Sequence, residues 1–464
     1  MPRPSNVGIK AIEIYFPRQV NPKSIITPFL NLYRYVCQSD LETHFGASPG
    51  KYTIGLGQRN MSFCDDLEDV YSFALTVTSN LLKKYNIDVS SIGRLEVGTE
   101  TSLDKSKSVK TVLMQLFGNN TSIEGADTMN ACYGGTNALL NSLNWIESSA
   151  WDGRDAIIVA SDIAVYPCGN ARPAGGAGAI ALLIGPDAPI VAEPGLRGTF
   201  MQHVYDFYKP DPSMEYGFLD AHYSVLCYIR ALDASYQNYC EREAKSCKGK
   251  EEKPRIGIDR FDYMIFHAPT CKVVQKSYAR LLYHDYLANP DAAIFSDVPR
   301  YMRSMSYESS LTDKQVERTF MTLSEDRFRS RVQPSLQVAT QCGNMYCASV
   351  WAGLASLTSA SNSEDLRGKR VGLFSYGSGL TSTFMSFRIR KSVAEISEAL
   401  ELDSRLADRL PASPSVYEDT CLLREKAYSQ KDFRPVGDVA KLTAGTYYLD
   451  QISSSFRREY KIKT

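Results

Sequence analysis

The sequence predicts an α/β fold from two observations. Short apolar runs bounded by glycine or polar residues alternate with longer stretches in which apolar residues recur every three or four positions. In addition, one order of elements occurs twice: a strand, a small-residue turn that opens a helix, and a strand bounded by glycine. We therefore expect two similar halves, residues 1–187 and 188–464, that share one active site.

The individual elements are expected where each pattern is clearest. The helical period predicts helices over Thr136–Ser148, Lys272–Leu287 and Ala348–Ser359. The short apolar runs predict strands over Arg94–Thr99, Ala156–Ala160, Gly178–Ile184, Tyr263–His267 and Val371–Tyr376.

Polar and charged segments connect and follow these elements. Glu241–Pro254 and Ser359–Lys369 are expected to be linkers. The pattern of the last ~70 residues predicts a polar, helical extension, which ends in Ala444–Leu449 and the basic segment Arg457–Lys463.

The composition excludes several classes of protein. With 464 residues and 44% hydrophobic residues, the chain can bury a large core, and 52 basic against 52 acidic residues favour neither nucleic acid nor an anionic membrane as a partner. No apolar run approaches the ~20 residues that span a bilayer, and Met1–Lys10 has neither a signal-peptide nor a transit-peptide pattern. Eleven cysteines without a CxxC or CxxH pair argue against zinc and against a disulfide scaffold. We expect a soluble protein of the reducing cytoplasm.

Cys132 is the candidate nucleophile. It lies in the stretch Asn130–Thr136, directly before an amphipathic helix pattern. A thiol at a helix N-terminus feels the positive end of the helix dipole and free backbone N–H groups, which lower its pKa. Gly134 and Gly135 permit a tight turn and the close approach of an acyl group. The alternative is a buried structural cysteine.

His267 is the candidate catalytic histidine among five. It ends the apolar run Phe261–Phe266, which places it at the carboxyl edge of a strand, where α/β active sites assemble. A satisfied core histidine is the alternative. Of the other four, His44 is expected in a polar loop, His222 in a turn and His284 on a helix. His203 is the reserve candidate.

Glu100 is the candidate carboxylate base, because it ends the strand pattern Leu95–Glu100. A carboxylate that is desolvated in a closed site has a raised pKa, whereas an ordinary surface glutamate does not. Gly372–Gly379 follows an apolar strand and can either supply a backbone N–H to an oxyanion or form a plain turn. Lys272 and Lys276, one helical turn apart, can face a nucleotide phosphate or solvent.

Eight stretches, spread over nearly the whole chain, match one known family in the same order. They are Ile14–Pro17, Lys51–Gln58, Gly93–Lys107, Asn130–Gly135, Trp151–Arg154, His203–Pro210, Gly343–Tyr346 and Phe374–Gly379. On these motifs the chain resembles the eukaryotic hydroxymethylglutaryl-CoA synthases of the thiolase-like superfamily. Cys132, Glu100 and His267 each fall on a catalytic motif of that family.

The resemblance implies a five-layered α-β-α-β-α thiolase-like fold, a homodimer, and an acyltransferase that needs no metal or redox cofactor. Its substrates would be CoA thioesters. Acetyl-CoA would condense with acetoacetyl-CoA and water to 3-hydroxy-3-methylglutaryl-CoA, an intermediate of the mevalonate route to isoprenoids and sterols. The destination of the product, sterols or a specialised metabolite, stays open.

The resemblance also implies a role for each site residue. Cys132 would take the acetyl group, Glu100 would remove a proton from its methyl group, and His267 would polarise and protonate the ketone oxygen of acetoacetyl-CoA. The backbone N–H groups of Cys132 and Ser378 would hold the thioester oxygen. Five further residues would shape the site: Asp162, Tyr166, Asp206, Asn344 and Tyr346.

The chain departs from the family pattern in or near the matched motifs. An apolar-rich insertion is expected between Gln19 and Ser39, and we interpret this segment as a poorly packed surface excursion, from which Asn21–Tyr35 can be deleted without loss of folding. The departures bear on activity rather than on the fold. Six positions differ from the family pattern. Phe45 stands where the family has an acidic residue, Ala221 where it has Gly, and His222 where it has Lys. Ala268 stands in place of Ser, Thr270 in place of Tyr, and Cys347 in place of Thr.

Two other functions fit the same residues. Cys132, His267 and Asn344 match the Cys-His-Asn set of a ketoacyl or polyketide-type synthase. Such enzymes generate their nucleophile by decarboxylation and need no carboxylate base like Glu100. The second alternative is a degenerate paralogue that keeps the fold and CoA binding, against which the intact catalytic residues argue.

Overall fold

The computed structural model describes residues 4–17, 35–247 and 257–464. Within them, nine strands form one sheet: β1 (Gly8–Tyr15), β4 (Ile92–Gly98), β5 (Asp127–Thr128), β6 (Asp155–Ala164), β7 (Gly176–Gly185), β8 (Ile190–Met201), β11 (Tyr263–Phe266), β12 (Arg370–Gly377) and β13 (Thr381–Ile389). Their order across the sheet is β11-β12-β13-β8-β1-β7-β6-β4-β5. β1 and β8 are joined through two residue pairs, Gly8 with Val191 and Ile9 with Ile190. The sheet therefore consists of two halves that meet at this seam.

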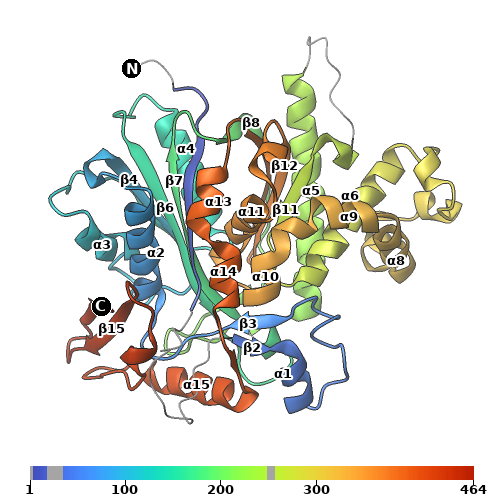
Figure 1. Cartoon of the computed structure of the whole chain (residues 1–464). Coiled ribbons are helices and arrows are strands. Elements are labelled where there is room, and N and C mark those ends of the chain that lie inside the picture. Colours follow the sequence, from blue (N-terminus) through green and yellow to red (C-terminus); the bar gives the residue numbers. More distant parts are fainter. Residues whose placement is uncertain (1–3, 18–34, 248–256) are drawn as a thin grey trace.

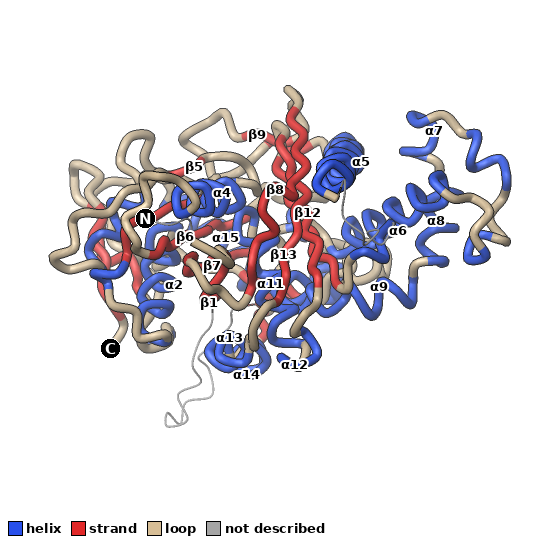
Figure 2. Tube along the Cα trace, turned by 90° about the horizontal axis from the view of Figure 1, so that it is seen from above, coloured by secondary structure: helices blue, strands red, loops and turns tan. Residues whose placement is uncertain are grey.

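Helices occupy both outer sides and the space between the two half-sheets (Figures 1 and 2). The six helices that make these layers are α2 (Val70–Lys84) and α3 (Val109–Leu113) outside the first half, α4 (Gly134–Ile146) and α11 (Ser349–Ala360) in the middle, and α5 (Ala221–Ser246) and α6 (Cys271–Ala288) outside the second. The five-layered fold that the resemblance implies is thus confirmed.

The middle layer contains the largest apolar core. Leu139 of α4 and Trp351 of α11 are fully buried in one cluster with Ile158 of β6 and Leu373 of β12. Since protein cores are packed as densely as organic crystals, this cluster fixes the two half-sheets relative to each other. It also fixes the turns at the helix ends, where the candidate catalytic residues lie.

The strands and helices predicted from the apolar patterns are all present, with ends shifted by a few residues. β6 runs on to Ala164 and so includes Asp162. Helix α5 was missed: His222 was expected in a turn and Glu241 in a linker, yet both lie in this 26-residue helix. Its buried residues Leu232, Tyr236 and Tyr239 follow a helical spacing that the polar residues between them obscure. The rest of that linker, from residue 248 on, lies outside the described residues.

The C-terminal region is helical only in its first part. Asp69, the N-cap of α2, accepts hydrogen bonds from Tyr460 (2.7 Å) and Arg458 (3.0 Å), and these contacts hold the last residues as a hairpin instead of a helix. The elements of this region are α13 (Ala394–Leu400), α14 (Leu402–Ala407), α15 (Pro414–Ala427), β15 (Tyr447–Ile452) and β16 (Arg458–Ile462).

Smaller elements complete the chain. The predicted linker Ser359–Lys369 contains one short helix, and His44 ends a helix rather than lying in a loop. Helices α7 to α9 extend outward beyond α6 (Figure 2). These elements are α1 (Gln38–His44), α7 (Tyr307–Thr312), α8 (Lys314–Leu323), α9 (Glu325–Arg331), α10 (Gln337–Cys342), α12 (Ser363–Leu366), β2 (Tyr35–Cys37), β3 (Asn60–Ser62), β9 (Phe207–Tyr208), β10 (Phe218–Leu219) and β14 (Pro411–Ala412).

The expected insertion Asn21–Tyr35 falls outside the described residues except at its end. Tyr35 begins β2, which pairs with β3 and with β14. The described end of the proposed excursion is therefore well packed, contrary to the prediction: it forms β2 and the start of α1, and Val36 and Gln38 are fully buried. Among the helices described, none is long and apolar enough to cross a membrane.

Glycine permits a very close approach of β4 to α4. A Cβ atom on Gly98 would lie 2.1 Å from the backbone of Gly134 and of Gly135. No side chain fits this space, since the neighbouring atoms are backbone. The contact sets the distance between the end of β4, which leads to Glu100, and the turn that holds Cys132.

We predict that Gly98→Ala lowers the free energy of unfolding by at least about 3 kcal/mol, because the backbone of β4 or α4 must move. Thermal unfolding measures this. Gly195→Ala is the control: its φ of +73° is unfavourable for alanine but nothing lies within 4 Å of the added Cβ, so it should cost about 1 kcal/mol. Equal melting temperatures for the two variants would contradict the argument.

Candidate active site

A cavity of about 280 Å³ opens between the two halves of the chain. Its lining combines residues that follow β5 and β6 in the first half with residues from α6, β12 and the segment after α10 in the second. Glu100 and Asp206 lie behind the lining and hydrogen-bond to it, through Cys132 and Tyr376. Asp162 lies further back and hydrogen-bonds to Glu100 and Cys347. Eight of the residues singled out from the sequence line the cavity: Cys132, Tyr166, His267, Lys272, Lys276, Asn344, Tyr346 and Ser378.

Cys132 lies in the turn between β5 and α4, with 8% of its surface exposed. Its φ of +54° is in the left-handed region, which costs a non-glycine residue of order 1–3 kcal/mol unless the surroundings hold it there. Two contacts do so. The backbone N–H of Cys132 donates to Glu100 Oε2, and Gly377 at the end of β12 packs so closely that a Cβ there would lie 1.9 Å from the carbonyl oxygen of Ala131.

The environment of the thiol differs from the one expected. Burial and then the negative charge of Glu100 raise the pKa of Cys132 well above its usual range, and Cys347 and Asp162 add to this. The predicted lowering by the helix N-terminus is therefore wrong: α4 begins only at Gly134, and burial together with the charge of Glu100 determines the pKa of the thiol instead. The thiol is protonated at neutral pH and must lose its proton as it reacts.

Glu100 is the residue on which this turn depends. Its side chain is 5% exposed, and Oε2 accepts the N–H of Cys132 while the thiol hydrogen-bonds to the same carboxylate. Burial raises the pKa of Glu100 to about 7, although Lys209, with Nζ 4.0 Å from Oε1, acts in the opposite direction. A carboxyl group with this pKa is divided between its acid and base forms at neutral pH, as a general base requires.

Asp162 connects the segments on either side of the nucleophile. Oδ1 accepts hydrogen bonds from Thr99 (2.7 Å), the backbone of Glu100 (2.9 Å) and Thr101 (2.8 Å), and Oδ2 accepts one from the backbone of Cys347 (2.9 Å). Burial raises the pKa of Asp162. Glu100, Asp162 and Cys347 offer possible metal ligands within 4.8 Å of one another, but the oxygens of Asp162 are already occupied by these protein donors.

His267 follows β11, with its backbone held on both sides. Its N–H donates to Phe374 (2.8 Å) and its carbonyl accepts from Tyr228 Oη (2.6 Å). The side chain is buried, and burial lowers the pKa of His267 to about 3, so the ring is neutral at every physiological pH. Nδ1 has no hydrogen-bond partner among the described residues. The residue lines the cavity, so part of its side chain is available to a ligand there.

Aromatic rings form one wall of the cavity. Tyr166 and Tyr346 lie 6.3 Å apart between ring centroids, and each also contacts Phe207. The N–H of Tyr346 donates to the side chain of Asn344 (2.9 Å), which fixes the lining residue Asn344. This wall is rigid and largely apolar.

Asp206 positions the turn that carries Ser378. Its carboxylate accepts hydrogen bonds from Tyr376 Oη (2.6 Å) and from the N–H of Gly379 (2.8 Å), on either side of Ser378. The other expected oxyanion donor is engaged, since the N–H of Cys132 points to Glu100. Before that N–H could bind a thioester oxygen, Glu100 would have to release it.

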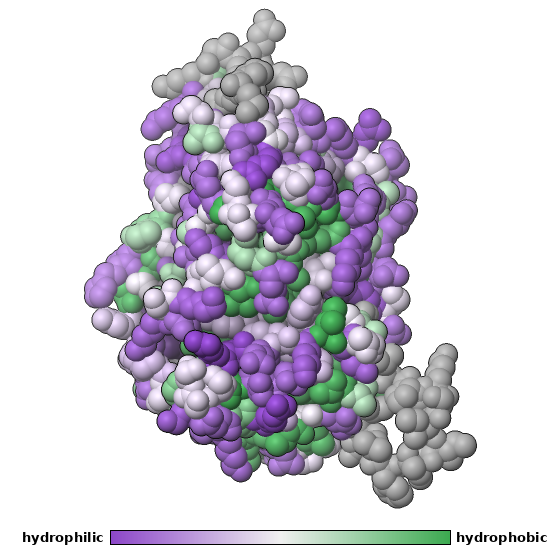
Figure 3. Space-filling view, turned by 90° about the vertical axis from the view of Figure 1, so that its left-hand side faces the viewer, coloured by the Kyte–Doolittle hydropathy of each residue, from purple (hydrophilic) through white to green (hydrophobic). Residues whose placement is uncertain are grey.

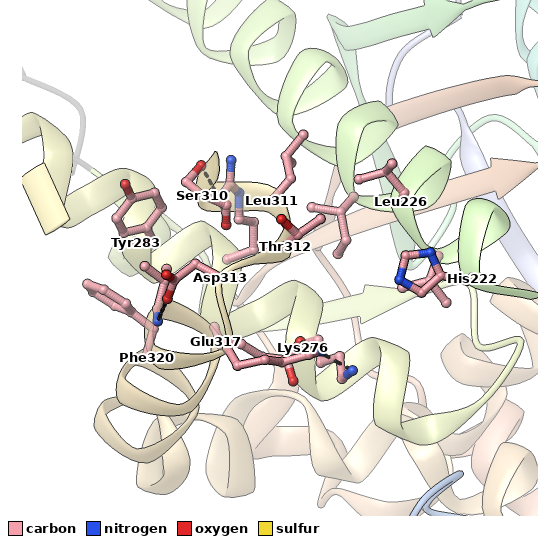
Figure 4. Close-up of a pocket in the computed structure, with 16 residues that line it drawn as sticks. His222, Leu226, Lys276, Tyr283, Ser310, Leu311, Thr312, Asp313, Glu317 and Phe320 are labelled. Carbon is pink, nitrogen blue, oxygen red and sulfur yellow. Dashed lines mark hydrogen bonds and ion pairs between the residues drawn. The ribbon is translucent and has the colours of Figure 1, made fainter. Parts of the chain in front are cut away.

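Lys272 and Lys276 lie at the mouth of the cavity, on α6. Lys272 Nζ donates to Gln275 (3.0 Å), and Lys276 Nζ lies 3.2 Å from Glu317 on α8. Lys276 also borders a second cavity of about 210 Å³ between α5, α6, α7 and α8, where Figure 4 shows it beside Glu317 and in the same opening as His222. The two cavities share Lys276 and Val225, so they are adjoining parts of one surface depression.

The departures from the family pattern are distributed unevenly around the site. Cys347 is next to the catalytic turn, with its sulfur 3.4 Å from the carbonyl oxygen of Asn130. Thr270 is the N-cap of α6. Both Thr270 and Ala221 line the cavity. Ala268 donates its N–H to Ser349 (3.2 Å) and is buried, whereas Phe45 packs in a separate cluster. The reserve candidate His203 is exposed and does not line the cavity.

Sequence reasoning missed Lys209 and Tyr228. Lys209 lies within the matched stretch His203–Pro210, but a buried lysine has no pattern that distinguishes it from an exposed one. Tyr228 lies on the missed helix α5 and lines the cavity beside His267. A helical reading of residues 221–246 would have placed it on the buried face.

The chain matches two family models in succession: hydroxymethylglutaryl-coenzyme A synthase N terminal over residues 3–189 and C terminal over residues 190–463. It is 63% identical to a hydroxymethylglutaryl-CoA synthase of Gibberella zeae, with 99% of each chain covered. It is 53% identical to that of Saccharomyces cerevisiae, over 99% of this chain and 91% of the yeast protein.

The fold is also similar to a solved structure of MvaS in complex with 3-hydroxy-3-methylglutaryl coenzyme A. The TM-score is 0.83, the sequence identity is 31%, and the match covers 100% of both chains. The similarity therefore includes every layer of the fold and both sides of the cavity.

We predict that Glu100→Gln makes Cys132 react faster with iodoacetamide at neutral pH, by about tenfold for each pH unit by which the thiol pKa falls. Removing the negative charge lowers that pKa, because the charge is the largest cause of its rise after burial. Alkylation rates against pH, measured by peptide mapping, test this. Glu124→Gln, at a 61% exposed side chain, is the control. A slower or unchanged reaction in Glu100→Gln would count against the assigned contact.

Proposed function

The chain belongs to the hydroxymethylglutaryl-CoA synthase family, and we propose that Cys132, Glu100 and His267 perform the three chemical tasks of its reaction. That reaction condenses acetyl-CoA with acetoacetyl-CoA and water to 3-hydroxy-3-methylglutaryl-CoA and CoA, in the mevalonate pathway. Because the chain belongs to this family, we discard the alternative that it is a ketoacyl or polyketide-type synthase. The single observation that supports the roles most is the buried Glu100 carboxylate, hydrogen-bonded to both the backbone and the thiol of Cys132.

The first task is acetyl transfer. The sulfur of Cys132 attacks the carbonyl carbon of acetyl-CoA, the bond from that carbon to the CoA sulfur breaks, and the thiol proton leaves with CoA. The position of Cys132 in a cavity lined by Tyr166, Asn344 and Tyr346 supports this role, since a buried thioester is protected from hydrolysis. Ser378, fixed by its neighbours' bonds to Asp206, is placed to bind the thioester oxygen.

The second task is removal of a methyl proton from the acetyl group. Ionised Glu100 takes the proton, and the electron pair of the C–H bond becomes the nucleophile that attacks the ketone carbon of acetoacetyl-CoA. Asp162 holds the backbone of Glu100, so the carboxylate approaches the acetyl group from a fixed direction. A pKa of about 7 supports this role at neutral pH.

The third task is protonation of the ketone oxygen as it becomes an alkoxide. Neutral His267 donates its N–H proton to this oxygen, and the proton that Glu100 took from the methyl group then restores the imidazole; burial keeps His267 neutral. Water attacks the thioester carbon, the bond from that carbon to the sulfur of Cys132 breaks, the sulfur takes a proton from the water, and the product leaves as a free carboxylate. We expect Lys272 and Lys276, which line the cavity, to exchange their present partners Gln275 and Glu317 for the phosphates of CoA.

The organisation and location of the protein are part of the proposal. Residues 1–187 and 188–464 would form the two halves, in agreement with the seam between β1 and β8. The eleven free cysteines suit a reducing cytoplasm.

We further propose a homodimer that pairs the β5 edges of two chains. In the described sheet β5 is an edge strand, and Met129, which follows it directly, is 78% exposed. Figure 3, in which the left-hand side of Figure 1 faces the viewer, shows patches of apolar side chains among the polar ones on that side of the molecule. An open edge next to exposed apolar residues favours pairing with an identical edge about a two-fold axis.

Glu100→Ala should separate the first task from the second. Acetylation should persist, because loss of the carboxylate makes the thiol of Cys132 more acidic, whereas condensation should fall by about 10²–10⁴-fold for lack of a base. Labelled acetyl-CoA with peptide mapping measures the first step and CoA release with acetoacetyl-CoA measures the whole reaction. Cys132→Ala, which should take no label, is the control. Near-normal condensation by Glu100→Ala would refute the proposed roles.

Met129→Asp should convert the dimer into a monomer, since a charge at the paired edge is repelled by its symmetry mate. Light scattering after size exclusion measures the mass. Ile294→Asp is the control, because Ile294 is also exposed (37%) but follows α6, at the opposite edge of the sheet. A dimer that survives Met129→Asp, or a monomeric unmodified protein, would rule out this interface.

A further inference from the structure

Lys209 is a buried ammonium without a hydrogen bond. Its side chain is 16% exposed, and Nζ has no hydrogen-bond partner among the described residues. It lies 5.0 Å from the ring centroid of Tyr346, 5.8 Å from that of Phe207 and 4.0 Å from Glu100 Oε1. Desolvating an ammonium is costly, and a position over two aromatic faces offsets only part of that cost.

The surroundings of Glu100 are otherwise unfavourable to a negative charge. Within the described part of the chain, Lys209 is the one cation at ion-pair distance from Glu100. The remaining titratable groups that influence it are acidic or uncharged and come from β6 and the segment after it, from the turn before α4 and from the segment after α10: Asp162, Tyr166, Cys132, Tyr346 and Cys347.

The two oxygens of Glu100 have different neighbours. Oε2 accepts the N–H of Cys132, whereas Oε1 has no hydrogen bond among the described residues and faces Lys209. Attraction at Oε1 and a hydrogen bond at Oε2 together fix the plane of the carboxylate. In that orientation the carboxylate stays hydrogen-bonded to Cys132, where the acetyl group would be attached.

We propose that Lys209 is a positioning residue that keeps Glu100 ionised and directed at the acetyl group on Cys132, so that proton removal from the methyl carbon can occur at neutral pH. This inference rests on the proposed role of Glu100. In the step itself the methyl C–H bond breaks, the proton binds to the Glu100 carboxylate, and the electron pair enters the enolate of the acetyl thioester. Lys209 neither gives nor receives a proton.

The sign of the expected effect follows from the charges. Lys209 opposes the rise of the Glu100 pKa, so its removal raises that pKa further above 7. A base with a higher pKa is protonated up to a higher pH, so the acid limb of the pH profile should move upward. We expect a shift of about one pH unit or more, equal to about tenfold less activity on that limb for each unit. Above the new midpoint, activity should recover.

The experiment compares Lys209→Met and Lys209→Gln with Lys209→Arg, which keeps the charge. The readout is exchange of the acetyl-enzyme methyl protons with solvent deuterium, followed against pH, together with the pH profile of kcat. The two uncharged variants should shift both profiles upward and Lys209→Arg should not. Lys10→Met, which removes a lysine of β1 that pairs with Asp155 at the start of β6, should leave the profiles unchanged.

Other outcomes would overturn the inference. A loss that is equal at all pH values would show a structural role, and a rise in KM with unshifted profiles would show that Lys209 binds substrate. Labelling of Cys132 by acetyl-CoA confirms that each variant is folded. Because two uncharged substitutions are made, the comparison still holds if one of the two variants fails to fold. The proposed function is tested separately, because near-normal condensation by Glu100→Ala would refute it whatever Lys209 does.

Discussion

The carboxylate of Asp162 is the interaction on which the arrangement of the site depends. It is fully buried and accepts hydrogen bonds from the end of β4 and from the segment after α10, which belong to different halves of the chain. A buried carboxylate is tolerated only when such donors satisfy it, so each donor segment is held in place by the cost of leaving the charge unpaired. Glu100 and Cys347 are held in position because their backbone N–H groups donate hydrogen bonds to the Asp162 carboxylate.

The nucleophile is positioned by backbone rather than by side chains. Gly98 lets β4 touch the start of α4, and Gly377 lets β12 touch the turn before it. Cys132 is then forced into a left-handed conformation and presents its sulfur to the cavity. The same two contacts bring both halves of the fold against one turn of five residues, Asn130–Gly134, which explains why neither half alone contains a complete site.

Much of this was accessible from the sequence. The apolar periods located the main strands and helices, and His267 and Glu100 were found because each ends an apolar run, a position that places a side chain at a sheet edge. Asp206, Asn344 and Tyr346 came only from family resemblance, since nothing in their local pattern marks them. Helix α5 was missed because polar residues interrupt its buried face, and the terminal hairpin was missed because its strands are stabilised by contacts with Asp69, almost 400 positions away in sequence.

The environment of the thiol was the least predictable feature. Its acidity depends on how completely Cys132 is buried and on which charge lies nearest, and both are tertiary quantities. Proximity to a helix start in sequence suggested an activated thiolate, whereas the folded chain puts a carboxylate against the sulfur. A local motif identifies the nucleophile but not the state in which it rests.

That resting state bears on how the protein withstands oxidants. Peroxides attack thiolates and scarcely react with thiols, so a sulfur that is kept protonated by burial and by a neighbouring carboxylate is oxidised slowly. Cys168, by contrast, is exposed. Under oxidative stress we therefore expect an exposed thiol of this kind to be oxidised before the nucleophile is affected.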